Sequence, residues 1–320
     1  MKNKNGVMSV KAIIKKITEQ IQEGIYPGAS LALYRNGQWS EHYLGLADPE
    51  KGESVVADLV YDLASVSKVV GVATICAFLY AKGELALDRP FKEFYPRFAH
   101  EKTTIRELLT HTSGLDPFIP NRDQLDARQL KTALENLQLK EDKSFHYTDV
   151  NFLLLGFWLE DRFHQPLDRL FEELIFTPWK MTETRFGPVE KAVPTVRGLA
   201  SGSVHDPKAR VLGRHAGSAG LFSTVADLER FLEHYLKDDF ARDLSQNFAR
   251  EEGKTRALGW NLEGDWLDHT GYTGTFIMYN RKRQEAVIFL SNRTYEKDER
   301  AQWILDRNSL MDLIKQECEK

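Results

Sequence analysis

The stretch Ser65-Val66-Ser67-Lys68, followed by the apolar run 69–80, decides how this chain is interpreted. An unbroken apolar run of this length is typical of a buried helix. Residues three positions apart share a face of a helix, so the amine of Lys68 can reach the hydroxyl of Ser65. Burial readily lowers the pKa of a lysine, and an amine beside a serine is the chemistry of an activated nucleophile. A chance serine near a lysine that extends to solvent from a helix end is the alternative.

Bulk properties restrict the class of protein. With 320 residues, 42% of them hydrophobic and 28% charged, the chain is expected to form one large domain or two closely packed ones. Its formal net charge of -4 offers no polycationic surface, so we expect neither nucleic acid nor anionic membrane as a partner.

Localisation is expected to be cytoplasmic, unless a leader was removed. The start of the sequence holds no apolar core typical of a signal peptide, and the run 69–80 is too short to span a bilayer. The two cysteines, Cys76 and Cys318, have no CxxC spacing, which fits a reducing compartment. Cys76 is predicted to be a small residue of the buried helix.

Predicted elements change in type along the chain. Residues 9–24 read as an amphipathic helix, and a hairpin follows, with strands at 29–34 and 39–46 around the turn 35–38. The middle of the chain is mainly helical, with helix starts at Thr104 and Thr224. Strands are predicted again over 266–270, 275–280 and 286–291, before a closing helix over 298–318.

This order predicts an α+β fold. Strands at both ends of the chain form one antiparallel sheet flanked by helices, and the helical middle is an inserted subdomain. We expect residues 1–88 and 251–320 to form the sheet subdomain, and residues 89–250 the helical subdomain. The active site is expected in the cleft between them.

Three further segments strengthen the interpretation of Ser65 as a nucleophile. In Tyr147-Thr148-Asp149, a phenol can accept the serine proton and a side chain two residues on can orient the lysine, although a tyrosine that only caps a core is an alternative. His269-Thr270-Gly271 ends a predicted strand, where a glycine lets substrate lie along the strand and a backbone N–H can face an oxyanion. Residues 217–224 alone would be a structural turn.

Taken together and in this order, these segments resemble the superfamily of serine β-lactamases and penicillin-binding proteins, specifically its class C-like branch. Residues 109–115, 204–206, 220–224 and 290–293 add to the resemblance, which runs from about residue 25 to 295. It implies the β-lactamase/transpeptidase-like arrangement of a sheet domain and a helical insertion.

The resemblance also implies roles for the matching residues. Ser65 would be the acylated nucleophile, Lys68 its proton partner, and Tyr147 the general base and acid of acylation and deacylation. His269, with Thr270 and Gly271, would occupy the third motif on the edge strand. The backbone N–H groups of Ser65 and Tyr272 would form the oxyanion hole.

Two positions depart from the family pattern. The third motif usually begins with lysine, a permanent cation that helps hold a substrate carboxylate, and here it begins with His269, which is mostly neutral near pH 7. This favours an ester or a peptide lacking that carboxylate over efficient β-lactam hydrolysis. The middle motif usually ends with an amide, and here Asp149 would favour the charged form of Lys68 and shift the base role toward Tyr147.

Other candidate sites are given structural roles. Ser67 adjoins Lys68 and points away from it on a helix, and Ser113 reads as part of a turn that ends a helix. His111 and His205-Asp206 suggest a Ser/His/Asp triad, but Lys68 and Tyr147 already supply the proton chemistry. No metal-ligand spacing or dinucleotide fingerprint is present, so neither metal nor cofactor is expected.

The sequence therefore predicts a serine hydrolase that forms an acyl-enzyme on an ester, amide or β-lactam carbonyl. Esterase or D-amino-acid peptidase activity, on a small-molecule or peptide substrate, is favoured over β-lactamase activity. The alternative is a non-catalytic relative that binds a ligand or a partner in the same cleft. The natural substrate and the oligomeric state stay open.

Overall fold

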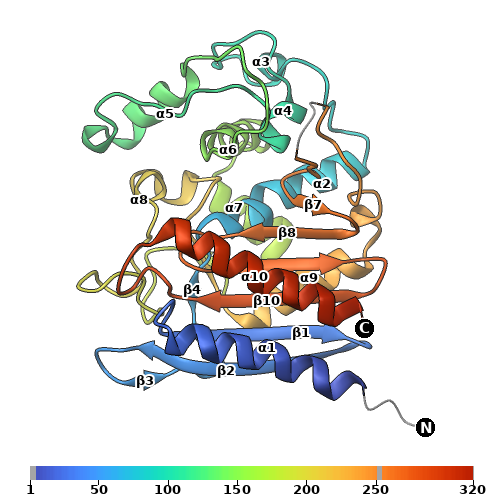
Figure 1. Ribbon diagram of the computed structural model, residues 1–320. Coiled ribbons are helices and arrows are strands. Elements are labelled where there is room, and N and C mark those ends of the chain that lie inside the picture. Colours follow the sequence, from blue (N-terminus) through green and yellow to red (C-terminus); the bar gives the residue numbers. More distant parts are fainter. Residues whose placement is uncertain (1–4, 251–253, 320) are drawn as a thin grey trace.

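A seven-stranded antiparallel sheet forms the centre of the computed structural model, which describes residues 5–250 and 254–319 (Figure 1). Its strand order is β3-β2-β1-β10-β9-β8-β7, so the first and last long strands of the chain pair with each other, Ala29 opposite Ser291. The strands are β1 (Gly28–Arg35), β2 (Gln38–Asp48), β3 (Glu53–Ser54), β7 (Asn261–Glu263), β8 (Trp266–Thr270), β9 (Phe276–Asn280) and β10 (Glu285–Ser291).

Ten α-helices surround this sheet in the described residues, together with a small second sheet of order β4-β6-β5. The helices are α1 (Asn5–Gln22), α2 (Thr74–Ala81), α3 (Phe91–Phe94), α4 (Ile105–Thr110), α5 (Ala127–Glu135), α6 (Val150–Phe163), α7 (Leu167–Phe171), α8 (Pro207–Leu212), α9 (Val225–Lys237) and α10 (Arg300–Glu319). The short strands are β4 (Tyr61–Asp62), β5 (Arg185–Phe186) and β6 (Leu221–Ser223).

Both faces of the large sheet are covered, which explains why β1 and β10 are buried along almost their whole length. Helices α1 and α10 cross one face (Figure 1). On this face Ile17 and Trp303 belong to the same buried hydrophobic cluster as Leu31. Helix α9 packs on the opposite face, against β1, β9 and β10. The sheet is therefore the middle layer of a helix–sheet–helix sandwich.

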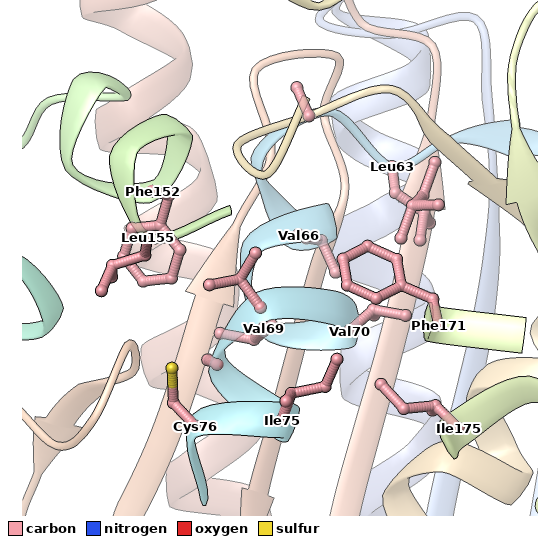
Figure 2. Close-up of a cluster of buried hydrophobic side chains, with 14 of the residues drawn as sticks. Leu63, Val66, Val69, Val70, Ile75, Cys76, Phe152, Leu155, Phe171 and Ile175 are labelled. Carbon is pink, nitrogen blue, oxygen red and sulfur yellow. The ribbon is translucent and has the colours of Figure 1, made fainter. Parts of the chain in front are cut away.

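The segment that follows Ser65 is the centre of the larger hydrophobic core. A 3-10 helix, Ala64–Val66, leads into a π-helical turn, Val69–Ala73, and then into α2. Val69, Val70 and Ile75 are fully buried, and Figure 2 shows them between Phe152 of α6 and Phe171 of α7. By length and hydropathy alone, the helical stretch Ala64–Ala81 could cross a membrane, but 78% of it is buried inside the protein, as in a core helix.

The predicted fold class is confirmed, with a large antiparallel sheet built from both ends of the chain. The long helices and strands lie within a few residues of their expected bounds, and Cys76 is a buried core residue. The division into subdomains stays a prediction, and its boundary after residue 250 adjoins residues 251–253, outside the described residues.

Two local expectations were wrong. The helix after Ser65 is not a regular α-helix from its start, because residues 64–66 form a 3-10 turn and residues 69–73 a π-helical turn. Strand β8, which carries His269, is not the edge strand, since β7 pairs with it from Asn261 to Glu263. That pairing reaches only to Asp268, so His269 and Thr270 extend past β7 and are unpaired on that side.

Candidate active site

The turn that carries Ser65 is held from two directions. Ala64, just before it, has a φ of +45°, a left-handed conformation that costs an alanine on the order of 1 kcal/mol. The carboxylate of Asp62 accepts the N–H of Ala64 at 2.8 Å and the N–H of His205 at 2.8 Å. These bonds fix the turn that places Ser65 at the start of the buried helical segment.

The loop between β8 and β9 supports the same turn from the other side. The hydroxyls of Thr273 and Thr275 donate to the carbonyl oxygens of Asp62 and Leu63, at 2.9 and 3.0 Å. Gly271 lies so close that a Cβ there would be 2.1 Å from Thr275 Oγ1 and 2.6 Å from the Leu63 carbonyl oxygen. Glycine is needed at 271 because the two segments approach backbone to backbone.

Lys68 is fully buried and all three of its ammonium hydrogens are used. Its Nζ donates to Ser65 Oγ at 2.9 Å, to Asp149 Oδ1 at 2.7 Å and to the carbonyl oxygen of Ser218 at 2.9 Å. Three acceptors around Nζ match the three N–H donors of an ammonium group. An ammonium nitrogen has no lone pair, so Nζ in this form cannot accept the proton of Ser65. The geometry therefore fits a charged Lys68 that orients Ser65.

Asp149 lies between two lysines. Its other oxygen, Oδ2, is 3.3 Å from Nζ of Lys208, which comes from α8. Burial alone raises the pKa of the Asp149 carboxyl, but Lys68 and Lys208 outweigh burial and hold that pKa at about 2. Burial alone lowers the pKa of Lys68, but Asp149 and Tyr147 together outweigh it and raise that pKa above its usual value. The site thus holds two cations around one anion.

Tyr147 is the accessible member of this group. Its ring centroid lies 5.2 Å from Lys68 Nζ, and the imidazole ring of His111 packs against it at 4.6 Å between centroids. Tyr147 is 37% exposed, whereas Lys68 is wholly buried, so substrate can reach the phenol but not the amine. His269, from β8, flanks the other side of Tyr147, with a centroid distance of 6.1 Å.

His269 is buried and uncharged. Burial lowers the pKa of its imidazole well below the usual value, and the positive charges of Lys68 and Arg256 lower it further. Its Nδ1 lies 3.1 Å from the carbonyl oxygen of Thr270. The third motif therefore supplies no permanent positive charge at this position, in accord with the expectation from the sequence.

A cavity of about 220 Å³ opens beside Ser65. Six of the expected site residues line it, from the Ser65 turn, the Tyr147 segment and the end of β8: Ser65, Tyr147, His269, Thr270, Gly271 and Tyr272. Lys68 and Asp149 lie behind Ser65 and do not line it. The structure thus brings all eight predicted residues together, in two layers; their individual roles stay predictions.

Several residues at this site were missed by the sequence interpretation. Lys208 was missed because nothing in the local sequence of α8 indicates that its side chain pairs with Asp149. In this region the sequence pointed only to the motif 204–206, whose Asp206 caps α8. One wall of the cavity is a face of α10. Its residues recur at helical spacing, and that spacing could have been noticed: Arg300, Trp303, Ile304 and Arg307. Phe145, Lys254, Asn261 and Arg293 complete the lining.

The alternative nucleophiles have structural partners. Ser67 Oγ accepts the N–H of Leu221 at 3.1 Å, and Ser113 Oγ donates to Asn151 Oδ1 at 2.8 Å. His111 contacts Asn151 through Nδ1, 3.2 Å from its Nδ2. Each of these side chains connects separate segments of the chain, and their structural role stays a prediction.

Comparison with known proteins identifies the relationship. The sequence model of the family described as Beta-lactamase matches residues 13–310. The chain belongs to the β-lactamase family. A protein of Escherichia coli (strain K12), named "Putative D-alanyl-D-alanine carboxypeptidase", is 28% identical over 353 residues, covering 87% of this chain and 81% of its own.

Solved structures share the fold of this chain. A β-lactamase/D-alanine carboxypeptidase from Pseudomonas syringae superposes with a TM-score of 0.76 at 19% identity, covering 97% of this chain and 99% of its own. EstCE1, described as a hydrolase with promiscuous acyltransferase activity, gives a TM-score of 0.78 at 19% identity, with the same coverage. Relatives of this β-lactamase-related kind are hydrolases, and the described residues hold no cluster of His, Cys, Asp and Glu that could bind a metal.

Proposed function

We propose that this member of the β-lactamase family is a serine hydrolase that forms an acyl-enzyme on Ser65. The observation that carries the proposal is the bonding of Lys68, whose buried ammonium group contacts Ser65 Oγ at 2.9 Å while Asp149 and Ser218 occupy its other hydrogens. A buried cation that points at a serine hydroxyl stabilises the alkoxide that develops during attack.

In the proposed reaction Ser65 Oγ attacks the substrate carbonyl and its proton passes to the phenolate oxygen of Tyr147, whose ring lies 5.2 Å from the ammonium group of Lys68. The developing oxyanion is held by the backbone N–H groups of Ser65 and Tyr272; within the described residues, the latter N–H makes no other hydrogen bond. Tyr147 then returns the proton to the leaving group, and water, activated in the same way, releases the acyl group from Ser65.

An ester or a D-amino-acid peptide is favoured over a β-lactam as substrate. His269 is neutral where a cation usually holds the carboxylate that a β-lactam carries on its rigid ring system. The names of the relatives support the broader class of reaction, since they include a D-alanyl-D-alanine carboxypeptidase, a β-lactamase/D-alanine carboxypeptidase and a hydrolase with promiscuous acyltransferase activity. A cytoplasmic location and a small-molecule or peptide substrate are part of this proposal.

The second candidate is a ligand-binding module without turnover, which the exposed cavity beside Ser65 would also permit. Lys68 argues against this candidate. Burying a charged lysine in an apolar helix costs desolvation free energy, and a protein that only binds a ligand does not need that lysine.

Intact-protein mass spectrometry separates the two candidates. The protein is mixed with a fluorophosphonate, a penicillin or an activated acyl ester, and the same is done with Ser65→Ala and with Ser67→Ala as the matched control. We expect an adduct in the wild type and in Ser67→Ala but not in Ser65→Ala, short-lived for the ester and slow to form for the penicillin. If folded wild-type protein forms no adduct with any of the three reagents, the binding-module function takes its place.

A further inference from the structure

Tyr272, whose backbone N–H is proposed to bind the oxyanion, is held by Arg293 and Asp298. Nε of Arg293 donates to the Tyr272 carbonyl oxygen at 2.8 Å, and the guanidinium group lies over the Tyr272 ring, 4.7 Å from its centroid. Nη1 of Arg293 donates to Asp298 Oδ1 at 2.6 Å, and the Tyr272 hydroxyl donates to Asp298 Oδ2. One ion pair, Arg293 and Asp298, thus binds both the backbone and the ring of Tyr272, and we call this pair the Tyr272 clamp.

The Tyr272 clamp reaches the β8–β9 loop from the end of β10. The backbone N–H of Arg293 donates to the Thr273 carbonyl oxygen at 3.0 Å, so Arg293 binds two successive carbonyl groups of the loop. Gly274 allows this approach, since a Cβ there would lie 2.7 Å from Arg293 Cγ and 2.3 Å from Ser291 Oγ. The side chain of Arg293 is only 2% exposed. Arg293 is therefore packed into the loop and does not extend over its surface.

These contacts fix the direction of the Tyr272 N–H. The planar peptide group between Gly271 and Tyr272 carries the Gly271 carbonyl oxygen on one side and the Tyr272 N–H on the opposite side. The carbonyl oxygen accepts the N–H of Gly274 at 3.3 Å, whereas the Tyr272 N–H has no acceptor within the described residues. Because the carbonyl groups on both sides of the Tyr272 Cα are bonded and its ring is held, its N–H has one direction and is available to a ligand.

Tyr272 is also connected to the Ser65 turn. The ring of His205 packs against the Tyr272 ring at 5.4 Å between centroids, and the N–H of His205 donates to Asp62 at 2.8 Å. Asp62 also accepts the N–H of Ala64, which directly precedes Ser65. The two N–H groups proposed for the oxyanion hole are therefore positioned by connected contacts. An oxyanion hole depends on such support, because its donors stabilise the developing charge only when they point at the place where it forms.

We infer that Arg293 is a positioning residue for the reaction: together with Asp298 it holds Tyr272 so that the Tyr272 N–H donates to the oxyanion. The inference rests on the proposed function, because it concerns acyl transfer at Ser65. Arg293 acts through Tyr272 and does not touch the reacting atoms. Two other roles must be separated from this one by experiment. The ion pair could serve stability alone, or the guanidinium could contact substrate directly, since Arg293 also lines the cavity.

The test compares a neutral activated ester with the matching thionoester, in which sulfur replaces the carbonyl oxygen. Sulfur accepts hydrogen bonds more weakly than oxygen, so the loss of an oxyanion donor slows the ester more than the thionoester. In Arg293→Gln we expect kcat/KM for the ester to fall at least about tenfold and kcat/KM for the thionoester less than about threefold. The ratio of the two kcat/KM values therefore falls. Loss of stability or of a direct contact with the neutral substrate would lower both values alike.

Arg106→Gln is the matched control. Arg106 also pairs with a carboxylate, Asp88 at 2.6 Å, and donates to a backbone carbonyl oxygen, that of Phe248 at 3.2 Å, but it does not line the cavity. We expect the ester-to-thionoester ratio of this variant to equal that of the wild type. Arg293→Lys keeps the positive charge but loses the planar fork that binds two acceptors, so its ratio is expected between those of wild type and Arg293→Gln. It decides the test if Arg293→Gln does not fold.

The outcomes distinguish this inference from the proposed function. If neither reagent acylates Ser65 in folded wild-type protein, the proposed function fails. If the wild type is acylated but folded Arg293→Gln, or Arg293→Lys in its place, keeps the wild-type ratio, the enzyme stands and the inference is overturned. An equally lowered ratio in Arg106→Gln also overturns it, because the ratio would then respond to any loosening of the fold.

Discussion

At the scale of single residues, the pair Asp149 and Lys208 gives a physical account of an acid at the position where the resemblance to the family predicts an amide. An unpaired carboxylate next to Lys68 would cancel the positive charge that Ser65 needs. Lys208 compensates the charge of this carboxylate, since its Nζ lies 3.3 Å from Asp149 Oδ2, the oxygen that does not bind Lys68. Together the two residues are a neutral unit, so the net charge around Ser65 is that of Lys68 alone.

This pairing predicts the outcome of a double-mutant cycle. Asp149→Asn leaves Lys68 and Lys208 without the carboxylate between them. Lys208→Gln leaves that carboxylate to neutralise Lys68. Each single variant is expected to lower kcat/KM at least tenfold. The double variant restores a single lysine and is expected to recover to within about threefold of wild type.

A pH profile gives the control for this cycle. Burial and repulsion by Lys208 both disfavour a charged Lys68 in Asp149→Asn, so its pKa falls and the alkaline limb of kcat/KM moves to lower pH. The limb is expected to return toward the wild-type position in the double variant. Additive losses, or an unchanged profile in Asp149→Asn, would contradict the neutral-unit explanation.

The residues of the catalytic group could largely be predicted from the sequence, because Ser65, Lys68, Tyr147 and His269 are each marked by a local motif. Lys208 and Ser218 could not be predicted, since their contacts with Asp149 and Lys68 depend on where α8 and the 217–224 turn lie in space. A local sequence motif contains only residues of one helix, strand or turn, whereas the contacts of Lys208 and Ser218 join segments that are distant in the sequence.

At the scale of elements, the β8–β9 loop and the Ser65 turn act as one unit. Thr273 and Thr275 donate to the turn, and Gly271 allows the two backbones to approach. The position of Ser65 therefore depends on an element more than 200 residues away in the chain, as the separations of 211 and 212 positions show.

Gly271→Ala is expected to disturb this unit. The added Cβ would lie 2.1 Å from Thr275 Oγ1 and 2.6 Å from the Leu63 carbonyl oxygen, so the loop must move away from the turn. We expect stability to fall by about 1–3 kcal/mol and the labelling of Ser65 by a fluorophosphonate to slow at least tenfold. Thermal unfolding and the time course of labelling measure the two effects.

The matched control is Gly264→Asn, in the β7–β8 turn. Gly264 has a φ of +58°, which asparagine accepts, and nothing lies within 4 Å of a Cβ there. Labelling is expected to keep its wild-type rate in this variant. Equal labelling rates in Gly271→Ala and the wild type would show that the loop does not position Ser65.

Among the elements, long periodic segments were predicted well, and short ones were not. Strands such as β7 and β4, of three and two residues, carry too little pattern to be recognised, and they exist because a neighbouring strand supplies their partners. The missed β7 is also why β8 was placed at the edge of the sheet.

At the scale of the whole molecule, a cluster of acids lies where α9 packs on the sheet. Glu229 of α9 is half-buried, and its Oε1 has no hydrogen-bond partner among the described residues. Burial raises the pKa of Glu229 to about 8, and repulsion from Glu41 and Glu233 adds to the effect. Folding therefore favours the protonated form of this side chain.

The cluster predicts how stability depends on pH. The pKa of Glu229 in the folded state lies above its ordinary value of 4.5, so its contribution is fully present below about pH 4.5 and is lost as pH rises through about 8. Glu229→Gln removes this loss. Because solvent screens part of the repulsion, we expect the variant to be more stable than wild type by about 1 kcal/mol at pH 8 and by less at pH 5.

Urea unfolding at the two pH values measures this difference, with the exposed Glu190→Gln as a control that removes a charge outside the cluster. The control is expected to match wild type at both pH values. A gain in Glu229→Gln that is equal at pH 5 and pH 8 would exclude the titration of Glu229 as its cause.

The pairing of β1 with β10 also sets an order in time. A ribosome makes residues 28–35 and the Ser65 turn early, but β10 and the threonines of the β8–β9 loop emerge much later. Until then β1 has an unsatisfied edge and Ser65 has a turn without its support. The nascent chain therefore carries the proposed nucleophile long before its turn is supported, and under the proposed function hydrolysis begins only when the two ends of the sheet have met.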